Sequence, residues 1–269
     1  MNIKLFELGK EAVLKQCPSA TKIYTPDVKG AQDNILIAKT PNCDMVFKFG
    51  NAELVKKNEA VSKLYNIRTI PVPQVTAHHI GDIHFEQYKK INGKTLFEAI
   101  KCGMSSEQIK QVYRDIVIEF AKMAQISPAY VNKHLINKVH DIARINISNT
   151  NNKILAHLFA TVVRLANIGD KKDLALYHSD ITPKNIIVSQ DGRFLGFIDM
   201  DNVCICSKSY AFSMMAAKYH ELGFDIRELM DEYYKASSEH LPADDIARRV
   251  KIVNASKRLL WKHSVSKQK

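Results

Sequence analysis

The chain has 269 residues, of which 46% are hydrophobic, and it contains only 10 glycines and 8 prolines. This composition is typical of a well-patterned globular protein that is long enough for one large domain or two lobes. The formal net charge is +11, but residues 246–269 alone carry eight basic and no acidic side chains. Because the rest of the chain is nearly balanced, the charge pattern argues against a uniform nucleic-acid-binding face, and we expect no nucleic-acid partner.

Apolar runs and cysteines indicate the compartment. No run approaches the roughly 18 apolar residues of a membrane span, and the first residues, MNIKLFELGKEAVLK, lack the apolar core of a signal peptide. An odd number of scattered cysteines argues for a reducing compartment. We therefore expect a cytoplasmic protein without a membrane span; its cysteines are Cys17, Cys43, Cys102, Cys204 and Cys206.

The first part of the chain predicts helices and short strands. Residues 2–17 have the apolar spacing of an amphipathic helix, which Pro18 ends. A second helix is expected after Asn51, a preferred N-cap residue, with Val55 and Tyr65 among the side chains suited to burial. Strands are predicted at residues 22–25, 34–39, 45–49, 74–80 and 83–88, between turn residues such as Pro, Gly, Asn and Asp.

The later part of the chain predicts mainly helices. Ser105 and Gln108 have the spacing of a capping box for a helix that runs to about Ile126. The helix expected at 226–237 has an acidic face, which we interpret as a solvated surface in preference to a site for a cationic substrate. The other predicted helices span residues 132–147, 152–168, 207–222 and 243–264.

The stretch YHSDITPKNIIVSQDGRFLGFIDMDN, residues 177–202, contains the most informative pattern. Three short apolar runs predict strands, and Asp191-Gly192 between the last two predicts a hairpin turn. Asp180 and Asn185 then lie on a loop and its exit, and Asp199 lies at the end of a hairpin strand. Two acids and an amide around one point suit Mg²⁺, which prefers oxygen ligands.

This stretch resembles the catalytic core of the protein-kinase-like phosphotransferases. In that core a catalytic aspartate is followed five residues later by an asparagine, and then by a metal-binding aspartate. HSDITPKN supplies the first two and IDMD supplies the third. The IDxD ending resembles the branch of aminoglycoside phosphotransferases and choline kinase-like small-molecule kinases. That branch usually has His-Gly-Asp, whereas Ser179 stands here at the glycine; a serine can follow the same backbone unless its φ is positive.

The resemblance implies an α+β, bilobal protein-kinase-like fold. Its small antiparallel-sheet N-lobe would span residues 1–88, and its mostly helical C-lobe, with the catalytic loop and substrate site, residues 89–269. The implied activity is ATP- or GTP-dependent transfer of the γ-phosphoryl group, with Mg²⁺, to a hydroxyl of a small molecule. Candidate acceptors are an aminoglycoside, an amino alcohol such as choline, or a sugar, and the acidic stretch near 225–232 favours a cation.

The resemblance also implies roles for residues of the core. Asp180 would accept or orient the proton of the acceptor hydroxyl. Asn185 and Asp199 would hold Mg²⁺, and Asp201 would either reach a second metal ion or cap the turn. Lys184 would add a positive charge near the transferring group.

Residues upstream would complete the nucleotide site. A strand lysine, Lys48, and a helix glutamate, Glu59, would form the ion pair that orients the lysine onto the α- and β-phosphates, with Glu53 as the competing glutamate. Gly30 lies where the family places its phosphate-covering loop. A single glycine taken alone favours an ordinary hairpin turn, and only its position before Lys48 favours the phosphate loop.

The crossing between the lobes is expected at the segment FEQYKKINGKTL. We place the hinge from Gln87 and Tyr88 to Lys90, where backbone groups would meet the adenine edge. A hinge that binds through its backbone leaves no side-chain signature, so the sequence does not distinguish ATP from GTP.

Two other functions are compatible with parts of the pattern. An atypical protein kinase would share the core, but no Ala-Pro-Glu segment or long activation loop follows Asp199. A non-catalytic nucleotide-binding regulatory module would not need to retain all four core residues, Lys48, Asp180, Asn185 and Asp199. Phosphoryl transfer to a small molecule is therefore the favoured hypothesis.

Overall fold

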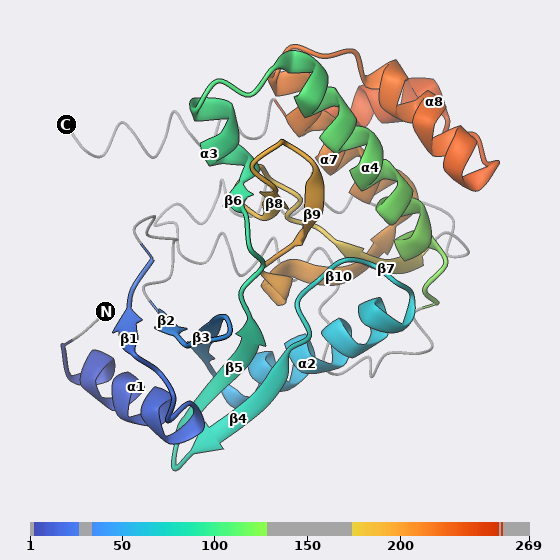
Figure 1. Ribbon diagram of the computed structural model, residues 1–269. Helices are drawn as coiled ribbons and strands as arrows, with labels where there is room; N and C mark the ends of the chain where they lie inside the picture. The colour runs from blue at the N-terminus through green and yellow to red at the C-terminus, as the bar shows by residue number, and fades with distance from the viewer. Residues whose placement is uncertain (1–2, 27–33, 128–173, 253, 255–269) are drawn as a thin grey trace, which may run out of the picture. The chain divides into compact units, whose positions relative to one another are not determined.

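The computed structural model of the protein describes residues 3–26, 34–127, 174–252 and 254, and it divides into two compact units (Figure 1). One unit comprises Met1–Gly93 together with Gly196–Asp201, and the other comprises Lys94–Leu195 together with Asn202–Lys269. The short segment that carries Asp199 and Asp201 therefore belongs with the N-terminal part of the chain.

The first unit is built on an antiparallel sheet, whose strands lie in the order β1-β2-β3-β5-β4. Each strand that the sequence predicts in this region is present within a few residues. The bounds are β1 (Lys22–Tyr24), β2 (Ile35–Lys39), β3 (Asp44–Gly50), β4 (Thr76–Ile80) and β5 (Ile83–Lys89).

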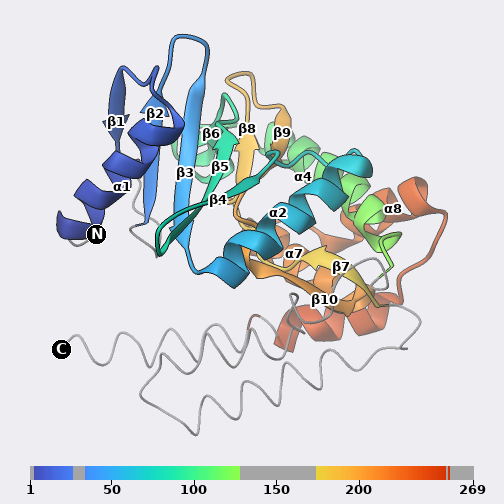
Figure 2. The same cartoon turned by 90° about the horizontal axis from the view of Figure 1, so that it is seen from below.

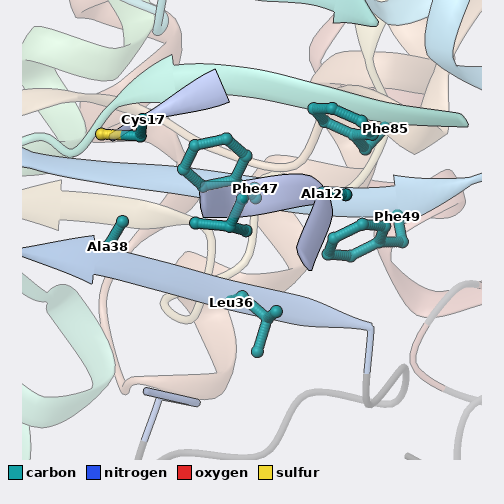
Figure 3. Close-up of a cluster of buried hydrophobic side chains, with 8 residues drawn as sticks. Ala12, Cys17, Leu36, Ala38, Phe47, Phe49 and Phe85 are labelled. Carbon is teal, nitrogen blue, oxygen red and sulfur yellow. The ribbon is translucent and has the colours of Figure 1, made fainter. Parts of the chain in front are cut away.

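Helix α1 (Ile3–Gln16) covers one face of this sheet and contacts β2. Because side chains alternate along a strand, Phe47 and Phe49 of β3 point to the same face. They form a buried cluster with Phe85 of β5 and with small side chains of α1 and β2, as Figure 3 shows. The same alternation turns Lys48 of β3 to the opposite face.

Helix α2 (Ala52–Ile67) packs against β3, β4 and β5, and Figure 2 shows it beside β4 and β5. The helix begins as predicted, since the Asn51 side chain accepts a hydrogen bond from the backbone N–H of Leu54 at 2.8 Å. Its buried residues recur at helical spacing and include Val55, Asn58 and Tyr65. This stripe fixes which residues of α2 face the sheet.

The second unit combines helices with short strands. The capping box of α4 is confirmed, because Ser105 and Gln108 exchange hydrogen bonds between side chain and backbone. The elements are β6 (Lys94–Thr95), α3 (Leu96–Lys101), α4 (Ser106–Ala124), β7 (Leu174–His178), β8 (Ile186–Val188), the start of β9 (Phe194–Phe197), β10 (Val203–Ser207), α7 (Lys208–Glu221) and α8 (Ile226–Ser237). Residues 243–252 are also helical.

Aromatic packing anchors the strand that leads to the catalytic motif. Phe120 of α4 stacks on Tyr177 of β7 with ring centroids 4.7 Å apart. Phe212 of α7 and Tyr233 of α8 meet the same Phe120 ring edge-on. Helices α4 and α8 lie side by side in Figure 1 and are in contact. The end of β7 is thus held from three helices.

Several short elements are absent from the prediction, among them β6, β10 and α3. Strand β10 pairs antiparallel with β7, with Val203 opposite His178, and helix α3 begins at a capping box formed by Thr95 and Glu98. The helices predicted at 132–147 and 152–168 lie outside the described residues, as does Gly30.

Candidate active site

Lys48 is the centre of a charged cluster in the first unit. Its side chain is almost fully buried, and its Nζ lies 2.7 Å from Oδ1 of Asp199 and 2.6 Å from Oδ1 of Asp201. Burial alone would lower the pKa of Lys48, but the neighbouring carboxylates outweigh it and raise the pKa above its ordinary value. The lysine is therefore a fixed cation at every physiological pH.

The backbone at Asp199 is unusual for a residue with a side chain. Its φ is +68°, in the left-handed region that non-glycine residues seldom adopt, although aspartate tolerates it better than most. Gly196, three residues earlier, has a φ of +152°, and a Cβ there would lie 2.5 Å from the backbone oxygen of Pro71. This close approach lets Phe197 N–H donate to the same oxygen at 2.8 Å. The turn that presents Asp199 is thus held against the backbone of Pro71.

Helix α2 contributes two buried polar residues to the cluster. Nδ2 of Asn58 donates to Oδ1 of Asp201 and to Oε1 of Glu86, each at 2.6 Å. Nζ of Lys57 donates to the backbone oxygen of Asp201 at 2.5 Å. Burial raises the pKa of Glu86 to about 7, although the charge of Lys48 and the hydrogen bond from Asn58 lower it. Sequence reasoning missed Asn58 and Glu86.

The predicted ion pair between Lys48 and Glu59 is wrong. Oε1 of Glu59 accepts a hydrogen bond from the backbone N–H of Ala77 at 3.2 Å and lies 3.4 Å from Nζ of Lys63. The reason is helical geometry, because the buried stripe of α2 contains position 58 and turns position 59 toward β4. Glu53 is exposed on the first turn of the same helix and is not the partner either.

The loop after β7 holds the predicted catalytic residues in the second unit. Nδ2 of Asn185 donates to Oδ2 and to the backbone oxygen of Asp180, each at 3.0 Å. The backbone N–H of Asp180 donates to Nδ1 of His178, which is buried at the end of β7. The structure therefore brings Asp180 and Asn185 together, as the motif predicts, and the histidine braces their loop.

Ser179 is accommodated at the position where the resembled branch has glycine. Its φ is not positive, and its Oγ donates to the backbone oxygen of Asn202 at 2.6 Å. Its backbone N–H donates to the same oxygen at 3.2 Å. The hydroxyl thus adds a hydrogen bond that a glycine cannot make, between the start of the catalytic loop and the residue that follows Asp201.

Three further residues were predicted to contact the nucleotide. Lys184 is exposed, and its Nζ lies 5.6 Å from the centroid of the Phe97 ring of α3. Gln87 and Tyr88 lie inside β5, opposite Phe47 and Val46, and the strand ends only at Lys89. The irregular segment of the predicted hinge therefore begins at Lys90, later than the sequence suggests.

Most of the chain matches a known family. A family model described as a phosphotransferase enzyme family matches residues 27–248. The chain belongs to this phosphotransferase family. No curated protein sequence matches the chain.

Solved structures share the fold of this phosphotransferase at low sequence identity. Amicoumacin kinase hAmiN in complex with AMP-PNP, Ca²⁺ and Ami has a TM-score of 0.68 at 13% identity, over 95% of this chain and 87% of that one. Aminoglycoside phosphotransferase APH(3'')-Id from Streptomyces rimosus, with ADP and streptomycin, has 0.64 at 14%, over 91% and 97%. Choline kinase LicA from Streptococcus pneumoniae has 0.63 at 16%, over 98% and 92%. The predicted α+β, protein-kinase-like fold is confirmed.

The candidate metal ligands of each unit carry oxygen atoms, which a hard cation such as Mg²⁺ prefers. Asp199 and Asp201 each place one carboxylate oxygen against the same ammonium nitrogen, so both converge on a point where positive charge is stabilised. Because the amide nitrogen of Asn185 donates twice to Asp180, the amide oxygen is left as an acceptor. Among the described residues no three His, Cys, Asp or Glu side chains converge as a metal site. Mg²⁺ itself needs only one or two protein carboxylates when phosphates supply the other ligands.

The acidic side chains near α8 are engaged by basic neighbours. Glu228 accepts hydrogen bonds from Lys110 and from the Tyr219 hydroxyl, and Asp225 pairs with Arg227. Two further pairs on this face are Lys235–Glu232 and Lys208–Glu239. These contacts agree with a solvated surface rather than a site for a cationic substrate.

No helix in the described ranges is long and apolar enough to cross a membrane.

Proposed function

We propose that the protein transfers the γ-phosphoryl group of ATP or GTP to a hydroxyl group of a small molecule. The observation that supports this proposal most is the convergence of Asp199 and Asp201 on the buried ammonium of Lys48. A lysine fixed in this way suits phosphoryl transfer, because the reaction depends on positioning and on neutralising phosphate charge.

Each residue of the core has a different role in the proposed reaction. Lys48 neutralises the α- and β-phosphates, and Asp180 orients the acceptor hydroxyl for attack on the γ-phosphorus. The hydrogen bonds from Asn185 fix the Asp180 carboxylate, which lowers the cost of ordering it in the transition state. As the new P–O bond forms and the bond to the leaving diphosphate breaks, the hydroxyl loses its proton, which the Asp180 carboxylate accepts.

Asn185, Asp199 and Asp201 are the residues that would hold Mg²⁺. When bound, the metal ion would neutralise the charge on the phosphate oxygens. Gly30, Gln87, Tyr88 and Lys184 remain proposed nucleotide contacts.

The acceptor is proposed as an aminoglycoside, an amino alcohol or a sugar. Several carboxylates near α8 pair with basic neighbours, so this surface gives little support for a cationic acceptor. The five cysteines form no disulfide in the structure, which supports a reducing compartment such as the cytoplasm as the place of action.

The test is ADP or GDP release with Mg²⁺ across a panel of aminoglycosides, choline, ethanolamine, homoserine and sugars. Release that one acceptor stimulates, and that an Asp180→Ala protein lacks, would establish a small-molecule kinase and name its acceptor class. Stimulation by a protein substrate instead would favour the atypical protein kinase. Nucleotide binding without release for any acceptor would favour the regulatory module.

A further inference from the structure

The register of β3 and β5 places a second acid beside Lys48. Lys48 is opposite Glu86 in the antiparallel ladder, and Phe49 is opposite Phe85. Because directly opposite residues point to the same face, Glu86 shares the face of Lys48, while both phenylalanines enter the cluster under α1. Opposite Cβ atoms lie about 4.5–5.5 Å apart, which is within reach of a charge interaction between these side chains.

Glu86 is deeply buried and is held in place by one neighbour. Its residue exposure is 3%, and that of Asn58, which donates to its Oε1, is 0%. A carboxylate buried to this extent is costly unless a cation and hydrogen bonds compensate it. Lys48 is the cation on the same face of the sheet, and its charge lowers the pKa of Glu86 against the effect of burial.

The other two carboxylates around Lys48 have a second task in the proposed function. Asp199 and Asp201 are proposed ligands of Mg²⁺, and a metal cation repels an ammonium group at the same point. If those carboxylates bound Mg²⁺, Lys48 would need another counter-ion, one carried by the sheet itself. Glu86 is on the neighbouring strand and is not a proposed metal ligand, so it can remain the counter-ion of Lys48.

We propose that Glu86, fixed by Asn58, is the positioning residue that holds Lys48 toward the nucleotide phosphates. This inference rests on the proposed function. In this chain Glu86 and Asn58 would replace the helix glutamate as the partner of the strand lysine. Helix α2 contributes an amide in place of an acid, and strand β5 contributes the acid. Asn58 also bonds Asp201, so it connects the lysine's counter-ion to the turn that carries both aspartates.

Glu86→Gln is the informative variant, because glutamine keeps the shape and the hydrogen-bonding capacity of the side chain while removing its charge. The first measurement is the affinity for ADP without divalent metal, where binding depends on the lysine and not on the proposed metal ligands. The second is the KM for nucleotide and kcat with Mg²⁺. Melting temperature is recorded alongside. Asp82→Asn, at the exposed β4–β5 turn, is the control, and Glu59→Gln tests the rival glutamate.

Glu86→Gln is expected to weaken metal-free ADP binding by about tenfold and to lower kcat/KM by at least as much, with an unchanged or higher melting temperature. Glu59→Gln and Asp82→Asn should each change both quantities less than about threefold. The pairwise test adds Lys48→Ala: if Glu86 acts through Lys48, Glu86→Gln should cause no further loss of ADP binding in that background.

Four outcomes would overturn the inference, the last of them together with the proposed function. ADP affinity of Glu86→Gln within about twofold of wild type, or the same further loss in the Lys48→Ala background, would show that Glu86 does not position the lysine. A larger loss of ADP affinity in Glu59→Gln than in Glu86→Gln would show that the glutamate of α2 positions Lys48. If the wild-type protein bound nucleotide and released ADP normally in these cases, the proposed function would stand. Absence of any nucleotide binding by wild type would instead overturn the proposed function and this inference with it.

Discussion

The free energy of unfolding should depend on pH through one buried acid, Glu86. Burial raises its pKa from an ordinary 4.5 to about 7. An acid whose pKa is higher in the folded state binds its proton more tightly there, so the folded protein loses stability as pH rises from about 4.5 to about 7 and changes little above. The shift corresponds to about 3 kcal/mol in total, of which about 2 kcal/mol falls between pH 5.5 and pH 8.

The assay is urea unfolding of the wild-type and Glu86→Gln proteins between pH 5.5 and pH 8, without nucleotide and with a chelator present. Other groups titrate in both proteins, so the difference between the two curves isolates Glu86. We expect Glu86→Gln to gain stability relative to wild type as pH rises, by about 2 kcal/mol over this range. Parallel curves, with a constant difference at every pH, would refute the reasoning that burial keeps this acid partly protonated.

Backbone and loop contacts give further predictions. Gly196→Ala should destabilise the protein by roughly 2–4 kcal/mol, because the added Cβ meets the Pro71 oxygen at 2.5 Å and the φ is strained; Gly81→Ala, with open space around it, should cost only about 1–2 kcal/mol in the same urea titration. Ser179→Ala should cost about 1 kcal/mol, because it removes the hydroxyl bond to the Asn202 oxygen but leaves the backbone bond in place. A Ser179→Ala protein as stable as wild type would show that the hydroxyl bond contributes nothing.

Local patterns predicted the framework around the site. The alternation in β3 and the cap at Asn51 are local signals, and both elements appear where the sequence places them. The HSDITPKN spacing likewise brought Asp180 and Asn185 into direct contact, because five residues of loop suffice to close a turn between them.

Contacts between residues far apart in the sequence could not be predicted from those local signals. The partner of Lys48 depends on the register between β3 and β5, which no short stretch of sequence specifies. One signal was available in α2: the buried stripe through Val55 and Tyr65 includes Asn58 and not Glu59. This helical spacing predicts that Asn58, and not Glu59, faces the sheet. Strand β10 was missed because its five residues, VCICS, are short and precede a stronger helix pattern.

The most direct test of phosphoryl transfer by this protein measures turnover and nucleotide binding on the same Asp180→Asn preparation. Asp180 acts on the acceptor hydroxyl, so its replacement should lower kcat by about a thousandfold or more. The affinity for ADP with Mg²⁺ should stay within about threefold of wild type. Unchanged turnover, or a loss of nucleotide affinity as large as the loss of turnover, would contradict the assignment of Asp180 as the residue that prepares the hydroxyl for attack.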